Sequence, residues 1–335
     1  MRTGAAAGHT GYFHEAIRYD SDEHLLAVVV PFLLGGVAAG EPAMVAFGAR
    51  NAALVRDALP AGCPVTFLPG GDVYARPAAA IRSYRKLLAE HVTAGAGQIR
   101  IVGELFPEHF GAVWDTWARY ESAINHAYDE FPLWSMCAYD ERTTPPAVLA
   151  DVDRTHPRTA RPGDRHEPNP AYTPPEEFLL ENRPVVTDPI QHGAPAAELL
   201  DPSPAQARDA VRAADDGGTP AGQVKELMLA VSEAVSNAHV HGQPPVRMRV
   251  WTGDGRMVVT VEDRGPGPKD PFAGMQPVAS ATSAGLGLWI AHQTCNHVSL
   301  HRGPEGFTIR LTAGPLPAGP PLPAGPPPAG PLPDG

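Results

Sequence analysis

The segment Leu227-Met-Leu-Ala-Val-Ser-Glu233-Ala-Val-Ser-Asn237-Ala-His-Val-His241 sets the fold of the second half of this 335-residue chain. Its apolar residues recur at helical spacing and predict one long helix from Pro220 to about His241. Glu233 and Asn237 are four residues apart, so their side chains share one helix face. On that face a carboxylate can serve a hydroxyl or a water, and an amide can serve a metal ion. By itself, such a pair is more typical of a polar face turned to solvent.

Two glycine-bearing segments follow this helix. Asp263-Arg-Gly265-Pro-Gly267 ends the strand predicted for Met257–Glu262, where a carboxylate and close backbone approach suit a ligand. Ser283-Ala-Gly285-Leu286-Gly287 opens a helix predicted from about Gly285 to Cys295. Glycines at a helix start expose N–H groups and the positive end of the helix dipole to an anion, typically phosphate. Taken alone, the first segment reads as a simple turn and the second as a weak G-x-G pattern.

Around these motifs, residues 186–313 predict a second ordered domain. Asp254-Gly255 is a strong hairpin signal between two strands. The further elements expected there are a helix at Ser203–Ala214 and strands at Val246–Trp251, His297–His301 and Phe307–Leu311. Helices packed on one face of a mostly antiparallel sheet, an α+β two-layer domain, are therefore expected.

The first block, from about Ser21 to Asp153, alternates helices with short buried strands. Ser21-Asp22-Glu23 offers an N-cap and an acidic first turn to a helix that ends at Gly35-Gly36 or Gly40. The expected strands are Ala43–Phe47, Val65–Leu68, Gln98–Val102 and Leu133–Tyr139, and the further helices are Asn51–Leu59, Pro77–His91 and Gly111–Tyr128. This order predicts an α/β domain with a parallel sheet covered on both faces.

Proline and glycine mark two other segments. Residues 158–185 are rich in proline among polar residues and predict a semi-rigid, solvated linker. Residues 314–335 repeat Pro, Ala, Leu and Gly and predict a disordered or polyproline-like tail. Such a tail can bind a proline-recognising module, although most tracts of this kind have no defined role.

Charge and composition exclude several classes of protein. The net charge of −11 disfavours nonspecific binding to nucleic acid. The chain has three lysines, Lys86, Lys225 and Lys269, and none follows a glycine, so a Walker A loop is excluded. The three cysteines form no C-x-x-C pair, which argues against a disulfide framework or a cysteine-rich zinc site. Without a secretory signal or an apolar run long enough to cross a bilayer, a soluble cytoplasmic protein is expected.

Together, the three motifs of the second block resemble the N, G1 and G2 boxes of the ATPase superfamily of gyrases, chaperones, histidine kinases and mismatch-repair proteins. The resemblance covers about residues 190–313. Within that superfamily the block is most similar to the bacterial anti-sigma factor serine-protein kinases, because its N-box helix reads like theirs and the segment Pro268–Ala284 is short. The resemblance implies that the chain binds ATP and Mg²⁺ and acts as a serine/threonine protein kinase.

The same resemblance implies a role for each candidate site residue. Glu233 would be the general base, and Asn237 would bind the Mg²⁺ that bridges the phosphates. Asp263 would accept a hydrogen bond from the adenine amino group, and Gly265 and Gly267 would admit the base. The phosphate-binding backbone would come from Ser283, Gly285, Leu286 and Gly287. Because Lys269 is the only basic residue from 268 to 284, nucleotide binding is better supported than catalysis.

A sensor histidine kinase is the rival within the superfamily. His166-Glu-Pro168-Asn-Pro170 superficially resembles its phosphoacceptor box, but the prolines break a helix there, so we reject His166 as a phosphoacceptor. His239 and His241 are two apart on a helix and face different directions, which argues against a two-histidine metal site.

Scattered residues of the first block, taken as a set, resemble the MEDS sensory domain named for methanogens, methylotrophs and the regulator DcmR. The similarity covers about residues 9–157, and its opening is distantly similar to the RecA/KaiC-type fold without a phosphate loop. The resemblance implies a small-molecule pocket. Its hypothetical contributors are His14, Tyr19, Glu104, Trp114 and Cys137. Cys137 can be a redox-sensing thiol, although a strand cysteine in an apolar run is usually inert.

We therefore expect a signalling switch built from a sensory domain at 9–157, a linker at 158–185, an ATPase domain at 186–313 and a tail at 314–335. The resemblance implies two partners, a sigma factor that the domain sequesters and a STAS-type anti-anti-sigma factor that it phosphorylates, so that the chain regulates transcription. The alternatives are a non-catalytic ATP-binding module and an atypical sensor histidine kinase. The sequence does not identify the sigma factor, the antagonist or the sensed ligand, and a homodimer stays open.

Overall fold

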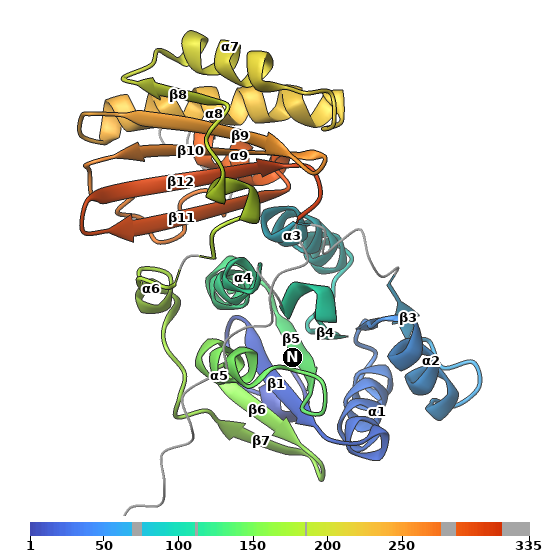
Figure 1. Ribbon diagram of the computed structural model, residues 1–335. Helices are drawn as coiled ribbons and strands as arrows, with labels where there is room; N and C mark the ends of the chain where they lie inside the picture. Colours follow the sequence, from blue (N-terminus) through green and yellow to red (C-terminus); the bar gives the residue numbers. More distant parts are fainter. Residues whose placement is uncertain (69–75, 111–112, 185, 276–285, 317–335) are drawn as a thin grey trace, which may run out of the picture.

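The computed structural model describes residues 1–68, 76–110, 113–184, 186–275 and 286–316. Two β-sheets, each with its own helices, lie one above the other (Figure 1). The lower unit in that view holds the N-terminal half of the chain, and the upper unit holds the C-terminal half.

The N-terminal sheet has the strand order β3-β2-β4-β5-β1-β6-β7. All neighbouring strands pair in parallel except β7, which is antiparallel to β6. Its strands are β1 (Phe13–Tyr19), β2 (Ala43–Ala46), β3 (Thr66–Phe67), β4 (Ile99–Gly103), β5 (Leu133–Asp140), β6 (Arg158–Arg161) and β7 (Arg165–Pro168). Its long helices are α1 (Asp22–Ala38), α2 (Ala49–Ala58), α3 (Pro77–Thr93), α4 (Trp114–Ala127) and α5 (Pro146–Thr155).

One hydrophobic cluster lies on each face of this sheet. Helices α1 and α2 supply one cluster, and α3, α4 and α5 supply the other. The expected parallel sheet with helices on both faces is therefore confirmed. Its resemblance to the RecA/KaiC-type fold stays a prediction.

Helix α1 begins at its predicted N-cap, passes through Gly35-Gly36 and ends before Gly40, the later of the two ends that the sequence offers. Ser21 accepts a hydrogen bond from the backbone N–H of His24 at 3.2 Å, and Asp22 and Glu23 occupy the first turn. After the helix, Gly40 adopts a φ of +69°, which glycine reaches without the clash that a Cβ would cause.

Strand β1 was not among the expected elements, although it lies between β5 and β6 inside the sheet. The apolar pattern typical of a buried strand is absent from β1, because His14 and Glu15 interrupt the apolar residues. Glu15 is nevertheless fully buried, where it accepts a hydrogen bond from Trp134 Nε1 at 2.8 Å and contacts His166 Nδ1 at 3.0 Å. These polar partners replace water and allow the strand to be buried on both faces.

The proline-rich segment 158–185, expected to be a solvated linker, carries ordered structure instead. Strands β6 and β7 extend the sheet, and the short helix α6 (Pro175–Phe178) packs against α4. The prolines sit at positions that tolerate them, since Pro168 ends the edge strand β7 and Pro175 is the first residue of α6. Elements of four residues are too short to show a period in the sequence.

Phe178 anchors this segment to the N-terminal unit. Its side chain is fully buried, with the guanidinium carbons of Arg183 and Arg154 at 4.9 and 5.0 Å from the ring centroid. Replacing it with alanine is expected to lower the free energy of unfolding by about 3–5 kcal/mol, as measured by urea denaturation. The matched control is Leu180→Ala, two residues on and 42% exposed, which should change it by less than about 0.5 kcal/mol. Equal small effects would mean that the segment is solvated.

The C-terminal sheet is antiparallel throughout, with the strand order β11-β12-β10-β9-β8. Its strands are β8 (Ala197–Leu200), β9 (Arg247–Gly253), β10 (Arg256–Asp263), β11 (His297–Gly303) and β12 (Gly306–Ala313). Helices α7 (Pro204–Ala214), α8 (Ala221–His241) and α9 (Leu286–Thr294) form one hydrophobic cluster with it. The expected two-layer α+β domain is confirmed, and Asp254 and Gly255 turn the β9–β10 hairpin with φ of 53° and 72°. Strand β8 was not expected, because it is a short edge strand.

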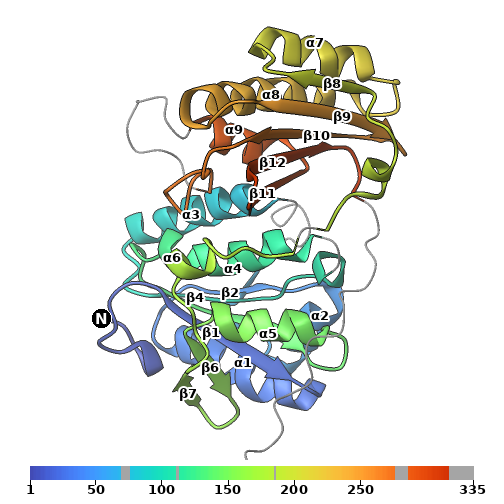
Figure 2. The ribbon, with the colours of Figure 1, turned by 60° about the vertical axis from the view of Figure 1, so that its left-hand side comes forward.

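The two units meet along α3, α4, α9 and β11 (Figure 2). Arg76 Nη1 donates to the carbonyl oxygen of Thr294 at 2.8 Å, and Thr116 Oγ1 lies 2.7 Å from His297 Nε2. The His126 ring stacks on Phe272, with centroids 4.1 Å apart. These contacts join the N-terminal half to the C-terminal half through buried as well as exposed groups.

Two buried histidines at this seam make stability depend on pH. Burial lowers the pKa of His292 to about 4 and, aided by Arg310, the pKa of His297 to about 3. The unfolded histidines titrate near pH 6.5, so between pH 6.5 and 4 the unfolded chain binds protons that the folded chain does not. The free energy of unfolding is therefore expected to fall as the pH is lowered from 7.5 to 5, by about 2 kcal/mol for each histidine.

Denaturation with urea at both pH values measures this loss, and His292→Leu should remove its share. The exposed His241, at the end of α8, gives the matched control His241→Leu, which should keep the wild-type dependence. An unchanged pH dependence in His292→Leu would contradict the assignment.

Candidate functional site

Three of the predicted site residues meet where α9 crosses α8. A Cβ placed on Gly287 would lie 2.9 Å from Glu233 Oε2 and 3.1 Å from Asn237 Nδ2. Helix α9 can thus approach this face of α8 only because position 287 carries no side chain. Glu233 and Asn237 are both half-buried, so the polar pair faces the first turn of α9 and not open solvent.

Asp263 ends β10 at the far end of the same helix. Its Oδ1 accepts hydrogen bonds from the backbone N–H of Gly265 at 2.6 Å and of Gln243 at 3.2 Å. The carboxylate is 8% exposed and packs directly on Gly242, the residue after α8, where a Cβ would overlap it. These contacts fix the direction of the carboxylate before any ligand arrives. The sequence analysis did not list Gly242 and Gln243, which contact the Asp263 carboxylate. Their position directly after α8, the helix that carries Glu233 and Asn237, is the sequence signal that could have identified them.

Glycines 265 and 267 keep the turn after β10 close to its neighbours. A Cβ on Gly265 would lie 2.7 Å from Asp263 Oδ1, and one on Gly267, whose φ is +75°, would overlap the Phe307 ring. Leu286, the first residue of α9, is exposed. Ser283 and Gly285 lie outside the described residues.

The candidate site residues lie along α8, from Glu233 to Gly242 just after its end. Nine residues of helix span about 13 Å, which is comparable to an extended nucleoside triphosphate. Glu233 and Asn237 lie at one end of this line with the start of α9, and Asp263 lies at the other. A helix start suits phosphate, and a fixed carboxylate suits the amino group of a base.

The N-terminal half contains a separate hollow of about 570 Å³ at the carboxyl ends of its parallel strands. Tyr19 and Glu104 line it. The Glu104 carboxylate accepts hydrogen bonds from the backbone N–H of Gly48 and from Asn51 Nδ2, both at 2.7 Å, and burial raises the pKa of Glu104. Burial also raises the pKa of Tyr19 to about 12. Ligands of open α/β sheets bind at this edge.

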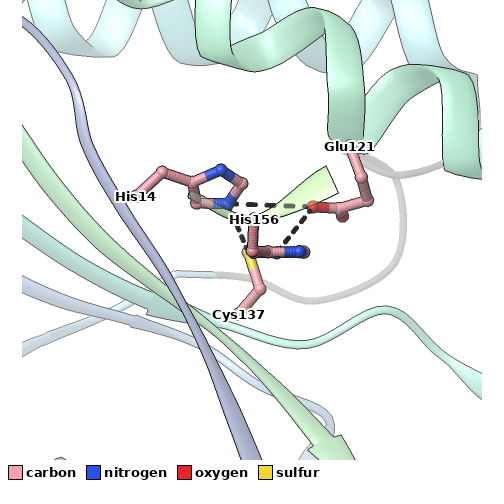
Figure 3. Close-up of side chains that lie close together, drawn as sticks. All are labelled: His14, Glu121, Cys137 and His156. Atoms are coloured by element: carbon pink, nitrogen blue, oxygen red, sulfur yellow. Dashed lines mark hydrogen bonds and ion pairs between the residues drawn. The ribbon is translucent and has the colours of Figure 1, made fainter. Parts of the chain in front are cut away.

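The other three hypothetical pocket residues lie elsewhere. Trp114 is buried, and its Nε1 donates to Asp151 Oδ2 at 2.8 Å. His14 and Cys137 meet each other in a buried cluster (Figure 3). The five residues predicted as one pocket therefore belong to three places in the domain.

The structure also places two histidines that the sequence analysis set aside as phosphoacceptor or metal ligand. His166 lies on β7, a strand, with its Nδ1 3.0 Å from both carboxylate oxygens of Glu15. His239 Nε2 contacts the carbonyl oxygen of Pro202 at 2.8 Å. Among the described residues, the helices are all too short or too polar to cross a membrane.

Comparisons with known proteins match both halves of the chain. Residues 13–157 match the family model of the MEDS domain, the methanogen/methylotroph, DcmR sensory domain. Residues 199–313 match the model of the histidine kinase-like ATPase domain.

Two individual proteins are similar to parts of the second half. The anti-sigma F factor of Bacillus subtilis (strain 168) is 33% identical over 100 residues, which cover 27% of this chain and 68% of that protein. The crystal structure of the RsbU and RsbW domains of Rv1364c from Mycobacterium tuberculosis aligns with a TM-score of 0.26 and 21% identity, over 35% of this chain. This chain spans about a third, 32%, of that solved chain.

Proposed function

This chain belongs to the anti-sigma factor family, and we propose that it phosphorylates a serine of a STAS-type antagonist with Mg·ATP. Its histidine kinase-like ATPase domain follows a MEDS domain in the chain. The resemblances drawn from the sequence to both families are confirmed. The chain is an anti-sigma regulator with an ATPase domain, and that domain implies ATP binding. The substrate serine, Mg²⁺ and the role of each residue belong to the proposal.

One observation carries the proposal, the meeting of Glu233, Asn237 and Gly287 at the crossing of α8 and α9. Phosphoryl transfer needs positioning, neutralisation of charge and an oriented nucleophile more than covalent chemistry by the protein. A helix start beside a carboxylate and an amide offers all three at one point.

In the proposed reaction, Glu233 takes the proton of the attacking serine hydroxyl. The serine oxygen forms a bond to the γ-phosphorus of ATP as the bond from that phosphorus to the β–γ bridging oxygen breaks, and ADP leaves. Backbone N–H groups at the start of α9 hold the phosphates, and the absence of a side chain at Gly287 lets them come close to Glu233.

Asn237 fits a magnesium site because its amide oxygen is a hard ligand of the kind that Mg²⁺ takes together with phosphate oxygens. Bound Mg²⁺ would neutralise charge on the phosphates. Asp263, held by the N–H groups of Gly265 and Gln243, turns its second carboxylate oxygen to the adenine amino group.

The partners follow from the family. A sigma factor bound to the ATPase domain would be withheld from transcription, and an unphosphorylated antagonist would displace it. A phosphate on the antagonist serine adds nearly two negative charges to that interface, which would release the antagonist.

The MEDS domain would supply the signal. A small molecule in the hollow lined by Tyr19 and Glu104 would act on the ATPase domain through α3 and α4, which carry the contacts of Arg76 and Thr116 to the C-terminal half. Ligands that change neither partner binding nor phosphotransfer would remove this coupling.

Two other functions are less well supported. A non-catalytic ATP-binding module would use the same site but would not need Glu233. A sensor histidine kinase would need an accessible phosphoacceptor, whereas His166 is held on β7 by Glu15 and Asp164.

Partner exchange tests the proposal. The chain is mixed with each sigma factor of its organism and separated by size-exclusion chromatography, and a STAS protein is then added before or after incubation with the chain and Mg·ATP. We expect the untreated STAS protein to release the sigma factor and the treated one to fail. Release by both, with ATP bound, would favour the non-catalytic module.

A further inference from the structure

Four side chains from distant parts of the chain meet inside the sensory domain (Figure 3). His14 comes from β1, Glu121 from α4, Cys137 from β5 and His156 from the residue after α5. Each offers one ligand atom, and these atoms all lie within 4.8 Å of one another. His14 and His156 are fully buried and Glu121 is 2% exposed, whereas Cys137 is partly accessible.

The surroundings aim a lone pair of each imidazole at the centre of the cluster. Asn125 gives its amide N–H groups to the carbonyl oxygens of Glu121, Ser122 and Thr155, so its Oδ1 accepts from His14 Nδ1 at 2.9 Å. His14 Nε2 is therefore the unprotonated nitrogen, and it faces Cys137 Sγ at 3.4 Å. Similarly, His156 Nδ1 donates to the carbonyl oxygen of Val152 at 2.9 Å, which leaves Nε2 as the acceptor.

The cluster lacks the hydrogen bonds that buried polar groups need. Glu121 Oε2 and His156 Nε2 are buried without a hydrogen-bond partner, although they lie 3.3 Å apart. Because His156 Nε2 carries a lone pair, it repels the carboxylate and does not pair with it. Two such orphaned atoms in one place destabilise the folded chain unless a further group joins them.

A divalent cation would give both unpartnered atoms, Glu121 Oε2 and His156 Nε2, a ligand bond. With a carboxylate and a thiolate it makes a site of zero net charge, which a dry interior accommodates best. A bound metal ion would displace the thiol proton.

Two of the separations between ligand atoms match those of tetrahedral coordination, and a third is slightly longer. Metal-to-ligand distances of zinc sites put neighbouring ligand atoms about 3.3–3.7 Å apart. Here the separations are 3.4 Å from His14 Nε2 to Cys137 Sγ, 3.3 Å from His156 Nε2 to Glu121 Oε2 and 3.9 Å from His14 Nε2 to Glu121 Oε2. We propose that His14, Glu121, Cys137 and His156 bind one zinc-type divalent ion. The mixture of thiolate, imidazole and carboxylate favours Zn²⁺ over Mg²⁺ or Ca²⁺, which take oxygen ligands.

Cys137, His14 and Asn125 also form the sequence of contacts used by cysteine nucleophiles. That use leaves the carboxylate of Glu121, which lies in the same cluster, without a role. A second imidazole aimed at the same point has no role in it, whereas the metal site uses all four groups.

The ion would tie together β1, β5, α4 and the end of α5, elements that are more than 100 residues apart at their extremes. Since metal affinity adds to folding free energy, Zn²⁺ should raise the melting temperature of the metal-free chain.

The test uses the full chain without a polyhistidine tag. After dialysis against a chelator, it is titrated with Co²⁺, which takes the place of Zn²⁺ and gives a thiolate-to-cobalt charge-transfer band. We expect one Co²⁺ per chain with that band, and one equivalent of Zn²⁺ should displace it. A wild-type chain that binds no ion stoichiometrically, or binds one without the thiolate band, would overturn the proposal whatever the variants do.

Two serine substitutions separate this site from the other thiols. Cys137→Ser should lose the band and weaken binding by more than about 100-fold, because it removes a ligand. Cys63→Ser, at a partly exposed thiol outside the cluster, is the matched control and should keep both. If Cys137→Ser is misfolded by circular dichroism, Glu121→Gln replaces it, with the band kept and the affinity lowered. Equal affinity in all variants would place the ion elsewhere.

Discussion

Replacing Glu233 with glutamine is expected to lower the rate of phosphotransfer to the antagonist by about 10²–10⁴-fold, because the amide cannot take the serine proton. The affinity for ATP should stay within about threefold, since the interaction with the hydroxyl matters chiefly in the transition state. Glutamine keeps the size of the side chain against Gly287, which leaves the crossing of α8 and α9 intact. Single-turnover transfer and ATP binding by calorimetry measure the two quantities separately.

The matched control is Glu226→Gln, an exposed glutamate on the same helix and seven residues before Glu233. It should change neither quantity. Transfer at the wild-type rate by Glu233→Gln would show that Glu233 is not the base, and equal loss in both variants would point to the charge of α8 in general.

Replacing Asp263 with asparagine is expected to weaken ATP binding by about 10–100-fold, the effect of one lost charge-assisted hydrogen bond. The variant should fold normally, because its Oδ1 can still accept from the N–H groups of Gly265 and Gln243. Those bonds force the amide N–H₂ group outward, so a donor replaces an acceptor at the base. The ratio of GTP to ATP affinity should therefore rise, since guanine carries a carbonyl oxygen where adenine carries an amino group.

Nucleotide binding by calorimetry checks this change of preference, with Asp209→Asn on the exposed face of α7 as the control. A loss of ATP and GTP affinity by the same factor would indicate that Asp263 supports the fold of the site and does not read the base.

The sequence predicted the ATPase half well because its motifs are local. Glu233 and Asn237 share a helix face because they are four residues apart, and the dipeptide Asp254-Gly255 by itself predicts the turn of the β9–β10 hairpin. The meeting of Gly287 with Glu233 depends on how α9 crosses α8, which no local pattern contains. Only the family resemblance brought the motifs together before the structure did.

The sensory half was harder to predict for physical reasons. Strand β1 is buried on both faces yet carries His14 and Glu15. The partner of His14 is Asn125, and the partners of Glu15 are Trp134 and His166, all of them more than 100 residues away. Elements β6, β7 and α6 are each four residues long, too short to show a periodic pattern. The proline content of the segment therefore determined the prediction of a linker. The four-residue cluster was likewise invisible as a unit, because its members are far apart in the chain and follow no ligand spacing.

The most direct measurement of the central claim is the intact mass of each STAS-domain protein of the organism after incubation with this chain and Mg·ATP. The account predicts a gain of one phosphate on a serine of one such protein, present with the wild-type chain and Glu226→Gln and absent with Glu233→Gln. A chain that binds ATP but adds no phosphate to any candidate would contradict the kinase and leave an ATP-binding anti-sigma module.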